Sequence, residues 1–176
     1  MGLIDLRKLN AEVDKLIAET ERATKEMVEA YDLRFEKMHD QMMEDLKPYA
    51  KLVKEVKPLD SVNVEAGTCQ YGCGDWKMFL VFNRWSGNCH ISIMCIRQSD
   101  GFGSFEGYLD LHNDIEQNRR HMRQYGPNIE TVVKTYFSER DQFEYRFTEE
   151  MTKAIKEKAA KANRDHEEAA RRLKEV

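Results

Sequence analysis

The dominant feature of this sequence is the stretch 3–57, in which apolar side chains recur every three or four positions. That spacing is the amphipathic signature of an α-helix, and no helix-ending glycine interrupts it before Pro58. The register shifts once near residues 27–31, and Pro48 predicts a kink or the start of a short separate helix. At about 1.5 Å per residue the helix is about 80 Å long, more than the width of a compact domain of this size. We therefore expect a long helix joined to a smaller folded part.

The composition agrees with long solvent-facing helices in a single domain, 1–176. Charged residues make up 34% of the chain and hydrophobic residues 41%, above and slightly below globular averages respectively. The net charge of −4 argues against general nucleic-acid binding and against a basic membrane-surface peptide. We expect no secretory signal and no membrane span, because the longest apolar runs, 78–82 and 91–96, are far below ~20 residues. The expected location is cytoplasmic, with the four cysteines as free thiols.

Residues 59–110 change to strand signals. The segments 76–85 and 89–98 flank Ser86-Gly87-Asn88, a turn in which glycine supplies the positive φ of a tight hairpin. Folding on that turn places six side chains on one face, which must be buried. The predicted cross-strand pairs are Phe82–Ile91, Leu80–Ile93 and Met78–Cys95.

The segments around this hairpin complete a small sheet and lead back into helix. Outer strands are expected at 61–66 and 105–110, with a glycine turn at 99–104. The sheet is then a three- or four-stranded antiparallel meander. Residues 111–125 predict one short helix, which Gly126 and Pro127 end.

Residues 129–174 predict a second long helix, with Asn128 as its N-cap. We expect it to pair antiparallel with the first helix, contacting residues adding to about 186, because bulky residues then meet near the sheet. The predicted fold class is α+β: an antiparallel coiled-coil stalk with a β-meander head. A narrow two-helix stalk buries few side chains, so a homodimer with twofold symmetry is expected. The predicted seam consists of Tyr31, Phe35, Met38, Met42, Phe143 and Phe147.

Cys69 and Cys73 have the separation of a zinc knuckle, and the alternative is a loop with buried thiols. The other two cysteines lie about 20 Å apart along one strand, so the four thiols cannot share one ion. A zinc site would need further ligands, such as Cys89 or His90 with His112 or His121. The alternative is favoured, and no metal or cofactor is expected.

Two further motifs have ordinary explanations. Glu36 and His39 form one Glu-x-x-His element, which di-iron bundles use twice, but a solvated helix face is the strongly favoured explanation. The spaced glycines of 100–107 lead into a strand and not into a helix N-terminus, which favours a hairpin turn at Asp100-Gly101 over a phosphate loop. No GxSxG, HExxH or Walker sequence occurs, and we expect no enzyme.

A basic cluster ends the short helix: Arg119, Arg120, His121 and Arg123. It could bind phosphate, or it could complement the negative end of the helix dipole. A nucleic-acid-binding protein that uses this cluster with Trp85 is therefore an alternative function. A metal-binding enzyme, built on the cysteines or on Glu36 and His39, is another.

A stalk with a small head displays much surface and little pocket. This predicts a non-enzymatic binding protein, an adaptor or inhibitor of a larger protein partner. The order long helix, β-meander, long helix is similar to that of the prefoldin chaperones, although the helix at 111–125 departs from their plan. In being small, acidic and poor in motifs, the chain resembles phage-encoded inhibitors of bacterial defence nucleases, including anti-CRISPR proteins. The residues expected to contact the partner lie on the head: Trp85, Tyr71, Phe102, Arg119, Arg120 and Arg123.

Overall fold

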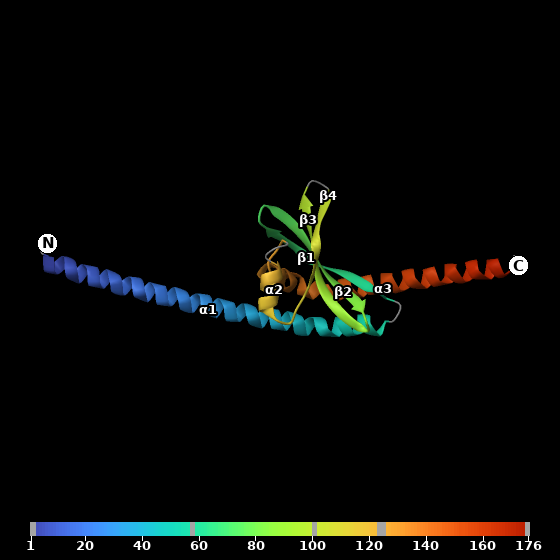
Figure 1. The fold of residues 1–176 in the computed structure, drawn as a ribbon, viewed down its shortest axis with the longest axis horizontal. Coiled ribbons are helices and arrows are strands. Elements are labelled where there is room, and N and C mark those ends of the chain that lie inside the picture. The colour runs from blue at the N-terminus through green and yellow to red at the C-terminus, as the bar shows by residue number, and fades with distance from the viewer. Residues whose placement is uncertain (1–2, 57–58, 100–101, 123–125, 175–176) are drawn as a thin grey trace. The chain divides into compact units, whose positions relative to one another are not determined.

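The computed structural model describes residues 3–56, 59–99, 102–122 and 126–174, and the fold is α+β. The elements of these ranges follow one another as shown in Figure 1: α1 (Leu3–Glu55), β1 (Ser61–Tyr71), β2 (Gly74–Trp85), β3 (Asn88–Ser99), β4 (Phe102–Asp110), α2 (Ile115–Met122) and α3 (Ile129–Lys174). The chain divides into two units, Met1–Met38 and His39–Val176. We call residues 3–38 the arm, residues 39–151 the head, and residues 152–174, the end of α3, the tail.

Helix α1 continues through Pro48 and ends at Glu55, two residues earlier than expected. Proline cannot donate the backbone hydrogen bond to the carbonyl four residues before it, so a helix interior loses stability there. Leu46 and Val53, on either side of the proline, are fully buried, and this packing holds both turns in place. The separate helix predicted at Pro48 is therefore not formed.

The strands form one antiparallel sheet in the order β1-β2-β3-β4, which confirms the predicted meander. β2 and β3 join through Ser86 and Gly87, with φ values of 50° and 80°. All three predicted pairs are present in the register: Phe82–Ile91, Leu80–Ile93 and Met78–Cys95. The outer strands are longer than expected, and the turn predicted at Asp100-Gly101 lies outside the described residues.

A bulge in β1 brings that strand against α3. The pairing of β1 with β2 shifts register between Glu65 and Gly67, and Gly67 has a φ of 138°. A Cβ atom at Gly67 would lie 2.8 Å from the Glu139 Cγ and 2.9 Å from the Thr135 Cγ2. Only glycine fits both the backbone conformation and the close approach to the helix.

One face of the sheet rests on both long helices. The Phe82 ring lies 6.5 Å from the Tyr49 ring of α1 and 5.4 Å from the Phe147 ring of α3, measured between centroids. Tyr49 also contacts Phe143, at 5.3 Å. The core of the head therefore forms where β2, α1 and α3 meet. The opposite face is covered in part, since Val81 there is buried.

Within the head, α1 and α3 run parallel, and the predicted antiparallel stalk is wrong there. Asp45 contacts Tyr136 and Arg140, and one turn later along α1, Tyr49 contacts Phe143 and Phe147. The residue numbers of the contacting positions therefore increase together along α1 and α3. In an antiparallel pair the number on one helix would fall as the number on the other rises. Four antiparallel strands end at the edge of the sheet where they began, with Ser61 and Asp110 at one end. Helix α2, which is bonded to His39, then lies between β4 and the start of α3 in the chain. The hairpin of helices on which the similarity to prefoldins depended is absent from this region.

The residues predicted to form a seam have different environments. Met42, Phe143 and Phe147 are at most 3% exposed in a single chain, so they are core residues of the head. Phe35 is also buried and Met38 is half-buried. Tyr31 is half exposed, with its ring 4.7 Å from that of Phe35.

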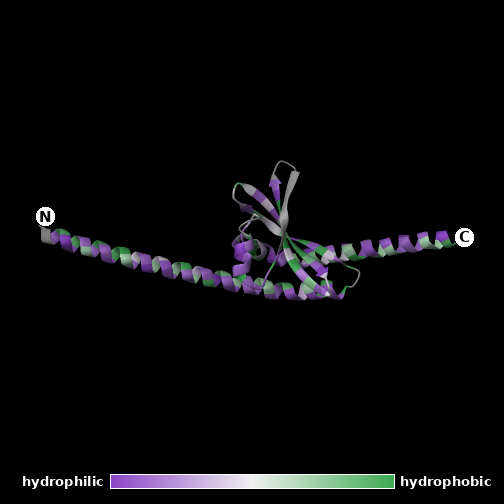
Figure 2. Cartoon of the chain, in the orientation of Figure 1, coloured by the Kyte–Doolittle hydropathy of each residue, from purple (hydrophilic) through white to green (hydrophobic). Residues whose placement is uncertain are grey.

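The arm and the tail expose most of their side chains. Hydrophobic and hydrophilic residues alternate along both, as Figure 2 shows. In the described ranges, no helix has a stretch long and apolar enough to cross a membrane.

Candidate functional site

Helix α2 begins at an aspartate cap. The Asp114 Oδ1 accepts a hydrogen bond from the backbone N–H of Glu116 at 2.9 Å, which is the N-cap arrangement. The helix therefore begins at Ile115, later than the predicted residue 111, and its described part ends at Met122. Arg123 lies outside the described residues.

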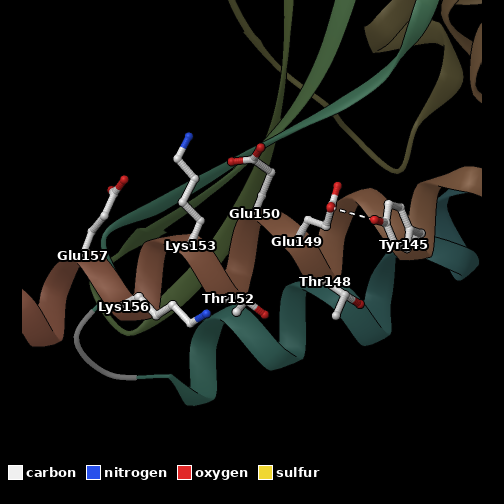
Figure 3. A pocket seen from close by; sticks show the side chains of 8 residues that line it. All are labelled: Tyr145, Thr148, Glu149, Glu150, Thr152, Lys153, Lys156 and Glu157. Carbon is white, nitrogen blue, oxygen red and sulfur yellow. Dashed lines mark hydrogen bonds between the residues drawn. The ribbon is translucent and has the colours of Figure 1, made fainter.

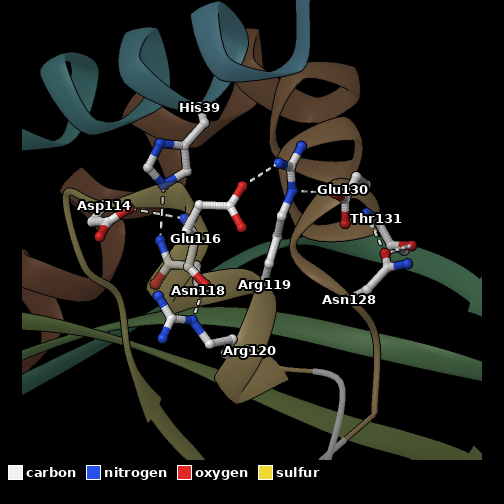
Figure 4. A network of polar contacts seen from close by, with 9 residues as sticks. All are labelled: His39, Asp114, Glu116, Asn118, Arg119, Arg120, Asn128, Glu130 and Thr131. Carbon is white, nitrogen blue, oxygen red and sulfur yellow. Dashed lines mark hydrogen bonds and ion pairs between the residues drawn. The ribbon is translucent and has the colours of Figure 1, made fainter. Parts of the chain in front are cut away.

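Arg119 is engaged by two carboxylates. Its Nε donates to the Glu130 Oε1 at 2.9 Å, and its Nη1 donates to Glu116 (Figure 4). Burial opposes the charge, but the bonds with both glutamates outweigh it and raise the pKa of Arg119. This guanidinium ties α2 to the first turn of α3. Arg120 is exposed, and its Nε donates to the Glu116 carbonyl at 3.4 Å.

A buried polar network joins α1 to α2. The Asn118 amide donates to the His39 Nε2 at 2.8 Å and to the His112 carbonyl at 2.7 Å, as the His39–Asn118 line in Figure 4 shows. Its oxygen accepts the His112 N–H at 2.9 Å. His39 and Asn118 are both fully buried, so this amide satisfies a buried imidazole nitrogen and both backbone groups of the half-buried His112. The arrangement makes Nε2 the acceptor and places the proton of neutral His39 on Nδ1, which faces Asp40 at 3.4 Å.

A cleft of about 530 Å³ lies beside this network. Its walls come from α1, from the start of β3 and from the segment that leads into α2. Met43, Ile91 and Leu111 provide apolar surface, while Lys47 and His90 provide polar groups. The full lining is Met43, Lys47, Ala50, Cys89, His90, Ile91, Asp110, Leu111, His112 and Asn113.

Trp85 lies next to the rim of this cleft. It is 76% exposed at the end of β2, and its ring centroid is 6.4 Å from that of His90, which lines the cleft. Trp76, in the same strand, is 5% exposed and donates its indole N–H to the Tyr71 carbonyl at 3.1 Å. The two tryptophans therefore differ: one packs the sheet, and the other faces solvent.

The residues predicted to contact a partner lie at two ends of the sheet. Tyr71 pairs with Gly74 at the β1–β2 turn, and Phe102 pairs with Ser99 where β4 begins. Trp85 pairs with Asn88 at the opposite end of the same strands. At about 3.3 Å per residue, the two ends of β2 lie about 36 Å apart. The predicted set is therefore not one continuous surface.

The thiols are poor candidates for metal ligands. Burial raises the pKa of Cys69, and it raises the pKa of Cys89 to about 11, so both thiols keep their protons at neutral pH. Cys73 is exposed in the turn after β1. Within the described ranges, no three His, Cys, Asp or Glu side chains gather closely enough to hold an ion. Glu36 and His39, the predicted Glu-x-x-His element, have different environments, because His39 is buried and Glu36 is exposed.

A second concavity, of about 620 Å³, lies along α3, and Figure 3 shows its lining. All of its lining residues come from this one helix, among them Tyr145, Thr148 and Thr152. Tyr145 donates its hydroxyl proton to Glu149 at 2.7 Å. This concavity is a groove on the exposed face of a helix near the root of the tail, and it brings together no distant parts of the chain.

Sequence reasoning singled out Trp85 but not the cleft beside it. Lys47, His90 and His112 come from three segments whose proximity depends on how α1 packs under the sheet, and no spacing in the sequence signals it. Asn118 was missed for the same reason, because its partners are 79 and 6 residues away. In comparisons with known proteins, no family model, no curated protein and no solved structure matches this chain.

Proposed function

We propose that this chain is a non-enzymatic protein-binding protein, an adaptor or inhibitor, whose head binds a larger protein partner at the Trp85 end of the sheet. The exposure of Trp85 is the observation that carries the proposal. A tryptophan is the largest apolar side chain, and it dominates interface energies when a partner covers it. Here it is 76% exposed at a hairpin tip, while the same strand buries Trp76.

The adjacent cleft supports the same surface. It has apolar walls and a few polar groups, the combination that accepts an inserted side chain with a defined orientation. Its rim residue His90 is in ring contact with Trp85, so one partner could cover both. Arg120 is exposed on α2, while Arg119 is already held by Glu116 and Glu130. The revised contact set is therefore Trp85, His90 and Arg120, without Arg119.

The test is a quantitative comparison of proteins retained from native host lysate by the tagged wild-type chain and by a Trp85→Ala variant. We expect at least one protein to be lost with the variant, and its measured affinity to fall at least about tenfold. Tyr145→Ala is the matched control, because this ring is also exposed but lies on α3. A partner that binds wild type and Trp85→Ala with equal affinity would overturn the assignment of this surface.

The narrower prediction, an inhibitor of a defence nuclease, stays a prediction. Its measurement is the cleavage rate of candidate nucleases in the presence of the purified chain, with Trp85→Ala as the comparison. Inhibition by wild type that Trp85→Ala lacks would support it. Equal cleavage rates with and without the chain would contradict it for the nucleases tested.

A further inference from the structure

The arm carries an apolar stripe that faces solvent. From residue 6 to residue 30 its members recur in alternating steps of three and four, the heptad pattern of a coiled coil. Leu16 and Met27, near its centre and end, are 63% and 72% exposed. A row of such side chains along one helix face marks a contact surface. The stripe is Leu6, Leu9, Val13, Leu16, Thr20, Ala23, Met27 and Ala30.

The tail carries a second stripe with the same stepping but with smaller side chains. Its ends are Ile155 and Leu173, which are 41% and 79% exposed. Between them the tail is exposed at nearly every position. At about 1.5 Å per residue this stripe is about 27 Å long, so it fits within the length of the arm stripe. Its members are Ile155, Ala159, Ala162, His166, Ala169 and Leu173.

The two stripes are complementary in size and in charge. The leucines of the arm are bulky, and the alanines of the tail let a facing helix approach closely. The arm stripe is flanked on one side by Glu12, Glu19 and Glu26. Of these, Glu19 and Glu26 have exposed partners within the arm at 3.9 Å, pairs that contribute little. The tail has eight basic residues against four acidic ones, and one flank of its stripe carries Lys158, Asp165 and Arg172.

A pairing of two arms lacks this complementarity. In an antiparallel pair of arms, the glutamate flanks would face each other and repel. In a parallel pair, Glu12 and Glu19 would lie beside Ile17 and Thr24, which offer no positive charge. The basic tail is therefore the better partner for the arm.

Each chain offers one stripe of each kind, because the arm precedes the head in the sequence and the tail follows it. We propose that the arm of one copy packs its stripe against the tail of a second copy, reciprocally, in a closed twofold dimer with two identical arm–tail contacts. This inference concerns self-association alone and does not rest on the proposed partner-binding function.

The experiment uses purified full-length protein and light scattering at micromolar concentration. Wild type should have twice the 20.7 kDa chain mass. An arm variant, Leu9→Asp with Leu16→Asp, and a tail variant, Ala159→Asp with Ala162→Asp, should each be monomeric. Circular dichroism and tryptophan fluorescence should show a folded head in both, because the four positions are exposed.

Mixing distinguishes an arm–tail contact from an arm–arm contact. The tail variant keeps an intact arm and the arm variant keeps an intact tail, so the mixture should form a heterodimer through one contact. The control is Ala11→Asp with Ala18→Asp, the same substitution on the opposite face of the arm, which should remain a dimer.

Charge reversal provides a second readout. Glu12→Lys with Glu19→Lys should weaken the dimer about tenfold at low salt. Adding Lys158→Glu with Arg172→Glu, two positions on one flank of the tail stripe, should restore it.

Three results would overturn the proposal. The first is a wild-type protein of monomer mass, and the second is a tail variant that remains a dimer. The third is a series of masses above the dimer, which would mean that the contacts do not close.

Discussion

The two halves of α1 have the same apolar spacing and opposite environments. In the arm, Leu16 is 63% exposed, whereas in the head Met42, on the stripe of the same helix, is fully buried. The hydropathy pattern does not distinguish them. The sheet and α3 cover the second half, through contacts such as Tyr49 with Phe82 and Phe147.

An amphipathic stripe therefore identifies a contact surface, but it does not indicate which element or molecule covers that surface. In the head the covering elements belong to the same chain, and the stripe becomes a core. In the arm the stripe faces solvent and is available to a second molecule. The comparison can be tested by matched substitutions on the two halves.

The largest expected effect comes from Met42→Asp. A carboxylate at this fully buried position has no partner, so the free energy of unfolding should fall by at least about 3 kcal/mol. Urea unfolding followed by tryptophan fluorescence measures it, because Trp76 is buried in the head. Leu16→Asp is the matched control. Compared in the monomeric tail variant, where no dimer contact is lost, it should change the free energy of unfolding of the head by less than about 0.5 kcal/mol. An equal decrease in the free energy of unfolding for the two variants would contradict the difference between arm and head.

A smaller effect is expected at the boundary of the two halves, from Asn118→Leu. The variant leaves His39 and the His112 backbone without their hydrogen-bond partner in a buried site. The free energy of unfolding should fall by about 2–3 kcal/mol, measured by urea unfolding. Gln117→Leu, at the exposed neighbouring position, is the control and should be near neutral. An unchanged stability for Asn118→Leu would mean that the network does not anchor α1.

The smallest effect appears only at alkaline pH and concerns the head, since the arm has no cysteine. Burial raises the pKa of Cys95 from 9.0 to about 12, and nearby Cys69 adds to the shift. Above pH 9 the unfolded chain loses this proton while the folded head keeps it. The stabilisation is therefore complete below pH 9 and is lost as the pH rises through about 12.

The measurement is the free energy of unfolding from about pH 8 to about pH 10.5. Because lysines and tyrosines also titrate there, the informative quantity is the difference in slope between wild type and Cys95→Ala. Wild type should lose stability more steeply. Parallel slopes would show that Cys95 ionises equally in both states.

Local patterns predicted most of the elements. The 3.6-residue period of the long helices, the turn at Ser86-Gly87 and the alternation of β2 and β3 depend on neighbours in sequence, and the strand register was confirmed pair by pair. The boundaries of α2 were less accurate. Its cap is Asp114, one of four polar residues in the stretch 110–114.

The sequence by itself determined the fold class, the meander and the existence of two amphipathic helices, because hydrogen bonding and periodicity are local. Only the tertiary structure decided that α1 and α3 run parallel, and that Met42 is core while Leu16 is exposed. It also decided that Trp85 lies beside a cleft lined by His90 and His112. These features depend on which faces meet across distant parts of the chain. A helix stripe is equally apolar whichever direction its neighbour runs, so its spacing contains no information about that choice.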